Sequence, residues 1–136
     1  MCSILLVEDH KIMAEALVRI LRTKGNFNIA DVAESAEDAM EWLSEQEAGP
    51  RVDLALVDVV LPRTSGIELV SMIQQKYPGI PCLMISGRSA GQYVKRSLAA
   101  GARGYVLKDD LQDVMKGVQH VLEGGTYLSE GLNREE

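Results

Sequence analysis

Carboxylates, a hydroxyl and an amine follow short apolar runs at four places in the sequence. Glu8 and Asp9 come after the run 4–7, and Asp58 comes after the run 54–57. Ser86 follows the run 82–85, and Lys108 follows the run 105–107. In an open parallel α/β sheet, ligands bind in the crevice at the carboxyl ends of the strands. If these runs are strands of one such sheet, the side chains meet in one pocket.

The acidic side chains would repel one another in such a pocket. Two unit charges about 5 Å apart interact by roughly 3 kcal/mol at an effective dielectric constant of 20. Such crowding costs stability or forces one acid to stay protonated, whereas a bound divalent cation removes the problem. Oxygen ligands suit Mg²⁺, and the sequence lacks the Cys/His spacing that is typical of zinc sites. The cluster therefore predicts a Mg²⁺ site.

A carboxylate beside the metal can also act as a nucleophile and form an aspartyl phosphate. We expect Asp58 to be this nucleophile, because its strand should be central and lie beside the strand that carries Glu8 and Asp9. The metal and Lys108 would neutralise oxygens of the phosphoryl group in the transition state, and Ser86 would donate a hydrogen bond to one of them. The residues together predict phosphoryl transfer.

Each of these residues also has an ordinary structural role open to it. Asp9 could cap the following helix, and Ser86 could cap another. Asp58 could stabilise a turn, and Lys108 could be a solvated surface lysine. His10 is expected to be exposed and to have no special role. Taken singly these roles are the commoner ones, but taken together they do not explain why all the groups stand at strand ends.

The rest of the sequence alternates between strand-like runs and helical patterns. Most runs are nearly continuously apolar, which is typical of strands covered on both faces, whereas the mixed run 27–33 fits an edge strand. Ser65 and Ser89 open capping-box patterns and predict the starts of two helices. The five βα units predict a doubly wound parallel sheet with helices on both faces. The predicted strands are 3–8, 27–33, 53–58, 81–86 and 104–107.

Length and composition limit the class of protein. The chain has 136 residues, the usual size of one domain, and a net charge of −6. An acidic domain is a poor match for the phosphate backbone of nucleic acid. No apolar run approaches the roughly 20 residues that span a bilayer, and the first strand leaves no room for a signal peptide. We expect a cytoplasmic domain that contacts neither membrane nor nucleic acid, with Cys2 and Cys82 as free thiols.

Four motifs in order resemble the receiver domains of two-component response regulators. They are Leu-Leu-Val-Glu8-Asp9, Asp58-Val-Val-Leu-Pro62-Arg-Thr-Ser-Gly66, Ser86-Gly87 and Gly104-Tyr105-Val-Leu-Lys108, within a resemblance that covers residues 3–123. The resemblance implies a flavodoxin-like, five-stranded parallel sheet of order 2-1-3-4-5. It also implies that Asp58 accepts a phosphoryl group from a sensor histidine kinase.

The resemblance assigns further roles. Glu8, Asp9, Asp58 and the backbone carbonyl of Val60 would hold Mg²⁺. Ser86 and Tyr105 match the family's switch pair: on phosphorylation Ser86 would turn toward the phosphate, and Tyr105 would move inward into the space it leaves. Such a change would alter the surface of the fourth helix and fifth strand, and homodimerisation is one expected consequence.

The end of the chain resembles one subfamily of these regulators. Residues 122–130 are similar to the segment that joins a receiver to a helix-turn-helix domain in LuxR/NarL-type transcriptional regulators. We therefore expect residues 1–128 to form the receiver domain and residues 129–136 to begin a linker or tail. By analogy, the domain would control a DNA-binding output domain that is absent from this chain.

Two alternatives keep the same fold. The first is a phosphate-independent interaction module, against which the complete set of strand-end residues argues. The second is a Mg²⁺-dependent phosphohydrolase with an aspartyl-phosphate intermediate. Such enzymes commonly place a general acid two residues after the nucleophile, where this chain has Val60. We therefore expect a signalling domain and not an enzyme.

Overall fold

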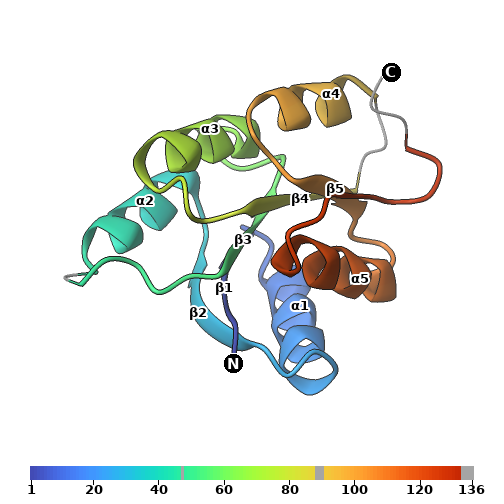
Figure 1. Cartoon of the computed structure of the whole chain (residues 1–136), viewed down its shortest axis with the longest axis horizontal. Helices are drawn as coiled ribbons and strands as arrows, with labels where there is room; N and C mark the ends of the chain where they lie inside the picture. Colours follow the sequence, from blue (N-terminus) through green and yellow to red (C-terminus); the bar gives the residue numbers. More distant parts are fainter. Residues whose placement is uncertain (47, 88–90, 133–136) are drawn as a thin grey trace.

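Strands and helices alternate along the chain up to the last helix (Figure 1). The computed structural model describes residues 1–46, 48–87 and 91–132. Its elements are β1 (Ser3–Val7), α1 (Lys11–Thr23), β2 (Asn28–Ala33), α2 (Ala36–Ser44), β3 (Leu54–Asp58), α3 (Gly66–Lys76), β4 (Cys82–Ser86), α4 (Gly91–Ala99), β5 (Gly104–Leu107), α5 (Leu111–Leu122) and β6 (Tyr127–Leu128).

The strands form one parallel sheet in the order β2-β1-β3-β4-β5-β6. Helices α1 and α5 cover one face, and α2, α3 and α4 cover the other (Figure 1). The predicted doubly wound α/β fold is confirmed, and the mixed run 27–33 is the edge strand β2, as expected. In the described part of the chain, none of the helices combines the length and apolarity needed to cross a bilayer.

The predicted strand count of five is wrong, because β6 extends the sheet beyond β5. Tyr127 pairs with Gly104, and Leu128 pairs with Tyr105. A strand of two residues is too short to show a period in the sequence. The pairing also depends on Gly104, since a Cβ atom there would lie 2.3 Å from the carbonyl oxygen of Tyr127.

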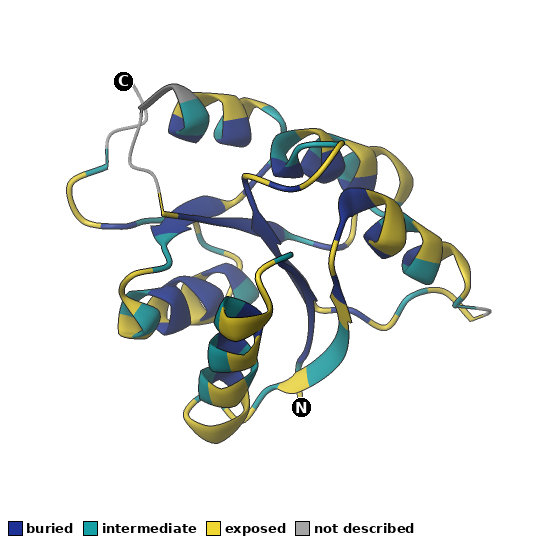
Figure 2. Ribbon diagram, turned by 180° about the vertical axis from the view of Figure 1, so that it is seen from behind, coloured by how far each residue is buried: buried dark blue, intermediate teal, exposed yellow. Residues whose placement is uncertain are grey.

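The core consists of two apolar layers, one on each face of the sheet (Figure 2). Every residue of β1, β3 and β4 is buried, which is consistent with their largely apolar sequences. Alternate residues point to opposite faces: Leu5 and Val7 pack toward α2 and α3, and Ile4 and Leu6 pack toward α1 and α5. The central strands are thereby packed on both faces, which fixes the positions of the residues at their carboxyl ends.

Side-chain caps define several helix starts. The hydroxyl of Ser65 accepts a hydrogen bond from the backbone N–H of Glu68 at 3.1 Å, which confirms the predicted start of α3. The start expected at Ser89 lies outside the described residues. Helix α1 has His10 at its N-cap position and no side-chain cap, so the capping role considered for Asp9 is wrong. The Asp9 carboxylate is therefore not used by the helix.

Candidate functional site

The carboxyl ends of the central strands bring the expected side chains together. Asp58 ends β3, which lies between β1 and β4, and Ser86 ends β4. Glu8 follows β1 directly, and Lys108 follows β5. Glu8, Asp58 and Ser86 are 1–2% exposed, although each carries a polar group. A hollow of about 340 Å³ opens above them and is lined by His10, Asp58, Val60, Ser86, Gly87 and Lys108.

Lys108 joins the two buried acids. Its Nζ donates a hydrogen bond to Asp58 Oδ2 at 2.7 Å and another to Glu8 Oε1 at 2.9 Å. The Lys108 side chain is only 14% exposed, so the solvated surface role is wrong. Burial alone would lower its pKa, but the hydrogen bonds to Asp58 and Glu8 raise it above the ordinary value. The amine is therefore a fixed ammonium group beside the expected nucleophile.

The two buried carboxylates differ in how easily they lose a proton. Burial raises the pKa of Asp58 from 3.8 to about 6, and the neighbouring Glu8 adds to this effect, while Lys108 opposes it. For Glu8, burial also acts to raise the pKa, but the hydrogen bonds from Lys108 and its other partners hold it below the ordinary value. The charge of Asp58 is thus the less well compensated of the two.

The loop from β3 to α3 fixes the direction of the Asp58 side chain. The backbone N–H of Val60 donates to Asp58 Oδ1 at 3.1 Å, so Asp58 also has the turn-stabilising role considered for it. Gly66 packs against the Asp58 backbone so closely that a Cβ atom would lie 1.9 Å from the carbonyl oxygen. Further along the loop, the Thr64 hydroxyl donates to Glu37 at 2.5 Å, which ties the loop to α2.

Several groups at this end of the sheet are able to bind a cation. Donor atoms of Glu8, Asp9, His10 and Asp58 all lie within 4.8 Å of one another. Oδ1 of Asp9 is buried and, among the described residues, has no hydrogen-bond partner. Three carboxylates with spare lone pairs fit Mg²⁺, which takes carboxylate oxygens and keeps waters. The role expected for the Val60 carbonyl stays a prediction, and the Val60 side chain is 50% exposed.

His10 is the residue that the sequence interpretation missed. Its ring is exposed, as expected, but Nδ1 lies 3.3 Å from Glu8 Oε2 and 3.4 Å from Asp9 Oδ1. The ring also lines the hollow above Asp58. The available signal was its place directly after the Glu8–Asp9 pair, where the first turn of α1 begins.

Tyr105 lies inside the protein. Its side chain is fully buried in the apolar layer that α2, α3 and α4 cover, together with Val94 of α4. Tyr105 pairs with Met84 of β4, and Met84 lies two residues before Ser86 on that strand. The backbone N–H of Ser129, beyond β6, donates to the Tyr105 carbonyl. The inward ring position expected for the switch is therefore the one this structure has, and the switch role itself stays a prediction.

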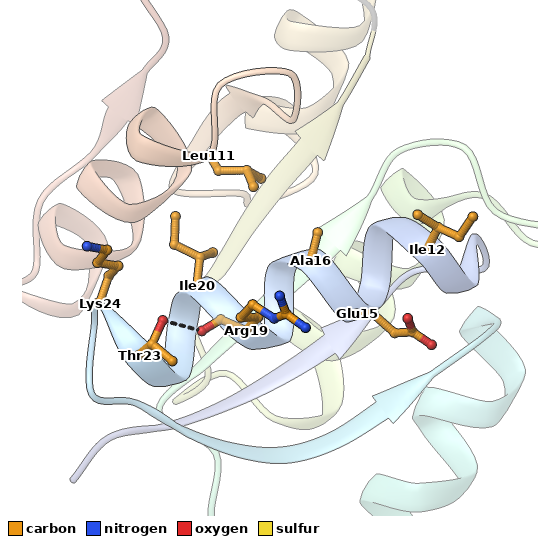
Figure 3. A pocket seen from close by; sticks show the side chains of 8 residues that line it. All are labelled: Ile12, Glu15, Ala16, Arg19, Ile20, Thr23, Lys24 and Leu111. Atoms are coloured by element: carbon orange, nitrogen blue, oxygen red, sulfur yellow. Dashed lines mark hydrogen bonds between the residues drawn. The ribbon is translucent and has the colours of Figure 1, made fainter.

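A second hollow, of about 420 Å³, runs along α1 toward the start of α5. Figure 3 shows Ile12, Ala16 and Ile20 in successive turns of α1, with Leu111 across from them. Ile12 is 85% exposed although it is apolar, and it lies two residues after His10. An apolar surface beside the candidate site is a suitable place for a protein partner.

Known proteins resemble this chain over most of its length. A family model described as "Response regulator receiver domain" matches residues 4–119. The transcriptional regulatory protein DegU of Brevibacillus brevis is 30% identical over 127 residues, which cover 93% of this chain and 52% of that protein. A cyclic di-GMP phosphodiesterase of Thermotoga maritima is 36% identical over 126 residues, which cover 92% of this chain and 32% of that protein.

A solved structure shows the same architecture. The LuxR-family two-component response regulator from Aurantimonas sp. SI85-9A1 matches with a TM-score of 0.86 and 25% identity, covering 96% of this chain and 91% of that one. The chain spans about half of DegU and about a third of the phosphodiesterase. The family model matches residues 4–119, and these residues form most of the doubly wound parallel sheet. This chain therefore belongs to the response regulator receiver domains.

Proposed function

We propose that this chain is a phosphorylation-dependent signalling domain that accepts a phosphoryl group on Asp58 from a sensor histidine kinase. The observation that carries this proposal is the position of the Asp58 carboxylate. It is 2% exposed, lies 2.7 Å from the Lys108 ammonium group and lines an open hollow. A buried carboxylate that lies beside a fixed ammonium group and an open hollow, with its pKa raised by burial, is typical of a functional site.

The chemistry follows from the groups around Asp58. A carboxylate oxygen attacks phosphorus, the bond from phosphorus to the donor nitrogen or oxygen breaks, and the leaving group keeps the electron pair. Mg²⁺, held by Glu8, Asp9, Asp58 and the Val60 carbonyl, would supply positive charge for the phosphoryl oxygens. Lys108 supplies a second, fixed positive charge, and the Ser86 hydroxyl is within the same hollow to hydrogen-bond an oxygen.

The phosphoryl group would act on the protein through Ser86 and β5. Ser86 and Tyr105 form the proposed switch pair, and Tyr105 lies beneath α4. A change in the Ser86 hydrogen bonds alters the packing beside Tyr105 and with it the surface of α4 and β5. We propose that this surface controls homodimerisation and a DNA-binding output domain, as the transcriptional role of DegU suggests.

The site is proposed to signal and not to turn over substrate. The position two residues after Asp58 is Val60, an apolar and half-exposed residue that has no proton to give to a leaving group. The relationship to the Thermotoga maritima phosphodiesterase covers 32% of that protein, so it carries no activity over to this chain. A cytoplasmic location is proposed because histidine kinase partners deliver the phosphoryl group there.

The experiment is intact mass spectrometry after incubation with acetyl phosphate and MgCl₂, with and without EDTA. The wild type should gain the mass of one phosphoryl group only when Mg²⁺ is present. The Asp58→Asn variant should gain none, whereas Asp109→Asn, which removes an exposed carboxylate near Lys108, should behave as the wild type. Equal labelling of wild type and Asp58→Asn would refute the assignment of Asp58.

If the wild type gains no mass, either the domain accepts phosphate only from its own kinase or it is not a phosphoacceptor. Transfer from a histidine kinase then has to be tested with a phosphorylated kinase domain as the donor. If this donor also fails while Mg²⁺ still binds, the domain is a phosphate-independent interaction module. In that case Ile12→Glu, on the exposed face of α1, should weaken partner binding without changing Mg²⁺ affinity.

A further inference from the structure

We propose that His10 is a ligand of the metal site and raises its affinity for transition-metal dications such as Ni²⁺ relative to its affinity for Mg²⁺. The inference rests on the proposed function, because it concerns the same cation site beside Asp58. It adds a nitrogen donor to a site that the strand-end residues alone define as all-oxygen.

The imidazole is within hydrogen-bond distance of the Glu8 carboxylate, and the same distances also fit ligands of one ion. Nδ1 of His10 lies 3.3 Å from Glu8 Oε2 and 3.4 Å from Asp9 Oδ1. Two ligand atoms that each lie about 2.0 to 2.1 Å from a metal are roughly 2.8 to 3.4 Å apart, for angles from octahedral to tetrahedral. An ion that contacts Nδ1 can therefore share either carboxylate oxygen, and donor atoms of all three residues lie within 4.8 Å of one another.

The backbone places the imidazole at this position. His10 is the N-cap residue of α1, in an extended conformation with φ −87° and ψ 111°. Its backbone N–H donates to Glu8 Oε2 at 3.2 Å, so the main chain of His10 and the carboxylate of Glu8 are fixed relative to each other. The other Glu8 oxygen, Oε1, accepts from Lys108. Oε2 is thus the Glu8 oxygen that faces the proposed ion.

The partner oxygen on Asp9 supports a ligand role independently. Oδ1 of Asp9 is buried and accepts no hydrogen bond among the described residues, and His10 Nδ1 lies 3.4 Å from it. A buried carboxylate oxygen that lacks a partner costs free energy, and a cation bound to that oxygen removes the cost. The His10 ring is 70% exposed, so it can turn to admit an ion from solvent beside this oxygen.

The nitrogen donor of His10 should increase the affinity of some cations more than that of others. Mg²⁺ prefers oxygen ligands and keeps several waters, so an imidazole adds little to its binding. Imidazole suits Ni²⁺, Cu²⁺ and Zn²⁺, whose affinities for nitrogen-containing sites also stand high in the Irving–Williams order. His10 should therefore separate the two classes of cation. A histidine that only makes hydrogen bonds to the carboxylates would not do so.

The test is isothermal titration calorimetry with NiCl₂ and with MgCl₂ on three proteins. They are the wild type, His10→Ala and His120→Ala; His120, the only other histidine, lies on α5 away from the hollow. His10→Ala should weaken Ni²⁺ binding at least about tenfold, as loss of groups around a metal does, and change Mg²⁺ binding less than about twofold. His120→Ala should leave both affinities at the wild-type level.

The outcomes separate this inference from the proposed function. Ni²⁺ affinity that is unchanged in His10→Ala would overturn the inference, and Mg²⁺ binding with Asp58-dependent labelling would still support the phosphoacceptor. An equal loss of Ni²⁺ and Mg²⁺ affinity would also overturn it, because His10 would then support the carboxylates without selecting the ion. A wild type that binds neither ion would refute both proposals.

Discussion

Replacing Asp58 by asparagine should make the metal-free protein more stable at neutral pH, although it removes the proposed phosphoacceptor. Two buried carboxylates, Glu8 and Asp58, share the single ammonium group of Lys108. The pKa of Asp58 is raised to about 6, which means that the folded protein disfavours the charged form. The asparagine side chain has nearly the same shape and carries no charge.

The size of the effect follows from the pKa. The difference between the ordinary value of 3.8 and the folded value of about 6 corresponds to roughly 3 kcal/mol, at about 1.4 kcal/mol per pH unit. The asparagine side chain has one acceptor oxygen, so it can accept from Lys108 or from Val60 but not from both. The lost hydrogen bond reduces this gain by about 1 kcal/mol. The expected net gain in unfolding free energy is about 2 kcal/mol.

The sign of the effect depends on pH. Below pH 3.8 the carboxyl group is protonated in both states, and Asp58 imposes no penalty. As the pH rises toward about 6, the unfolded chain releases this proton before the folded one does, so the wild type loses stability. The advantage of Asp58→Asn should therefore be absent near pH 4 and complete above pH 7.

Urea unfolding in EDTA at several pH values between 4 and 8 measures this difference. Asp109→Asn removes an exposed carboxylate nearby and should change the unfolding free energy by less than about 0.5 kcal/mol. The reasoning is refuted if Asp58→Asn is as stable as the wild type or less stable at pH 7.5, or if its advantage does not vary with pH. Added Mg²⁺ should stabilise the wild type more than the variant.

Three further predictions concern the scaffold of the site. Gly66→Ala should destabilise the fold by more than about 2 kcal/mol, because its Cβ would lie 1.9 Å from the backbone carbonyl at the end of β3, whereas Gly79→Ala, with nothing within 4 Å, should be nearly neutral in urea unfolding. Burial raises the pKa of Cys82 to about 12, so a thiol reagent should label only Cys2 until denaturant is added. Tyr127→Phe should cost about 1 kcal/mol, because the hydroxyl donates to a carboxylate in the first turn of α5. That hydrogen bond raises the pKa of Tyr127 to about 12, so its contribution should persist below pH 10 and disappear as the pH approaches 12 in base-induced unfolding.

The main features of the site could be predicted because they follow from strand topology. Parallel strands of one sheet place their carboxyl ends at the same edge, so residues that follow β1, β3, β4 and β5 had to meet there. The sequence also indicated that Asp58 ends a central strand, because the run before it is continuously apolar.

Two features depend on contacts that no local pattern encodes. Strand β6 is short, and contacts with residues distant in the sequence hold it in place. The hydroxyls of Tyr127 and Ser129 both donate to Asp113 of α5. The Ser129 hydroxyl also accepts from the backbone N–H of Leu107. Ser129 is buried by these contacts, although the expected domain boundary lies just before it. Likewise, the place of the His10 ring depends on the N-cap conformation of α1.

The charges of the site give a physical reason why a divalent cation and a phosphoryl group would be coupled in the proposed function. Glu8, Asp9 and Asp58 contribute three negative charges and Lys108 contributes one positive charge, so the cluster has a deficit of two positive charges that one dication removes. Phosphorylation of Asp58 would replace one negative charge by roughly 1.5 to 2 negative charges and add strong acceptor oxygens. These oxygens would need donors, and among the described residues Ser86 supplies a hydroxyl to the same hollow. Ser86 lies on β4, beside the strand that carries Tyr105, and Tyr105 packs in the same apolar layer as α4. A hydrogen bond from Ser86 to the phosphoryl group would therefore change the surroundings of a residue that packs near α4.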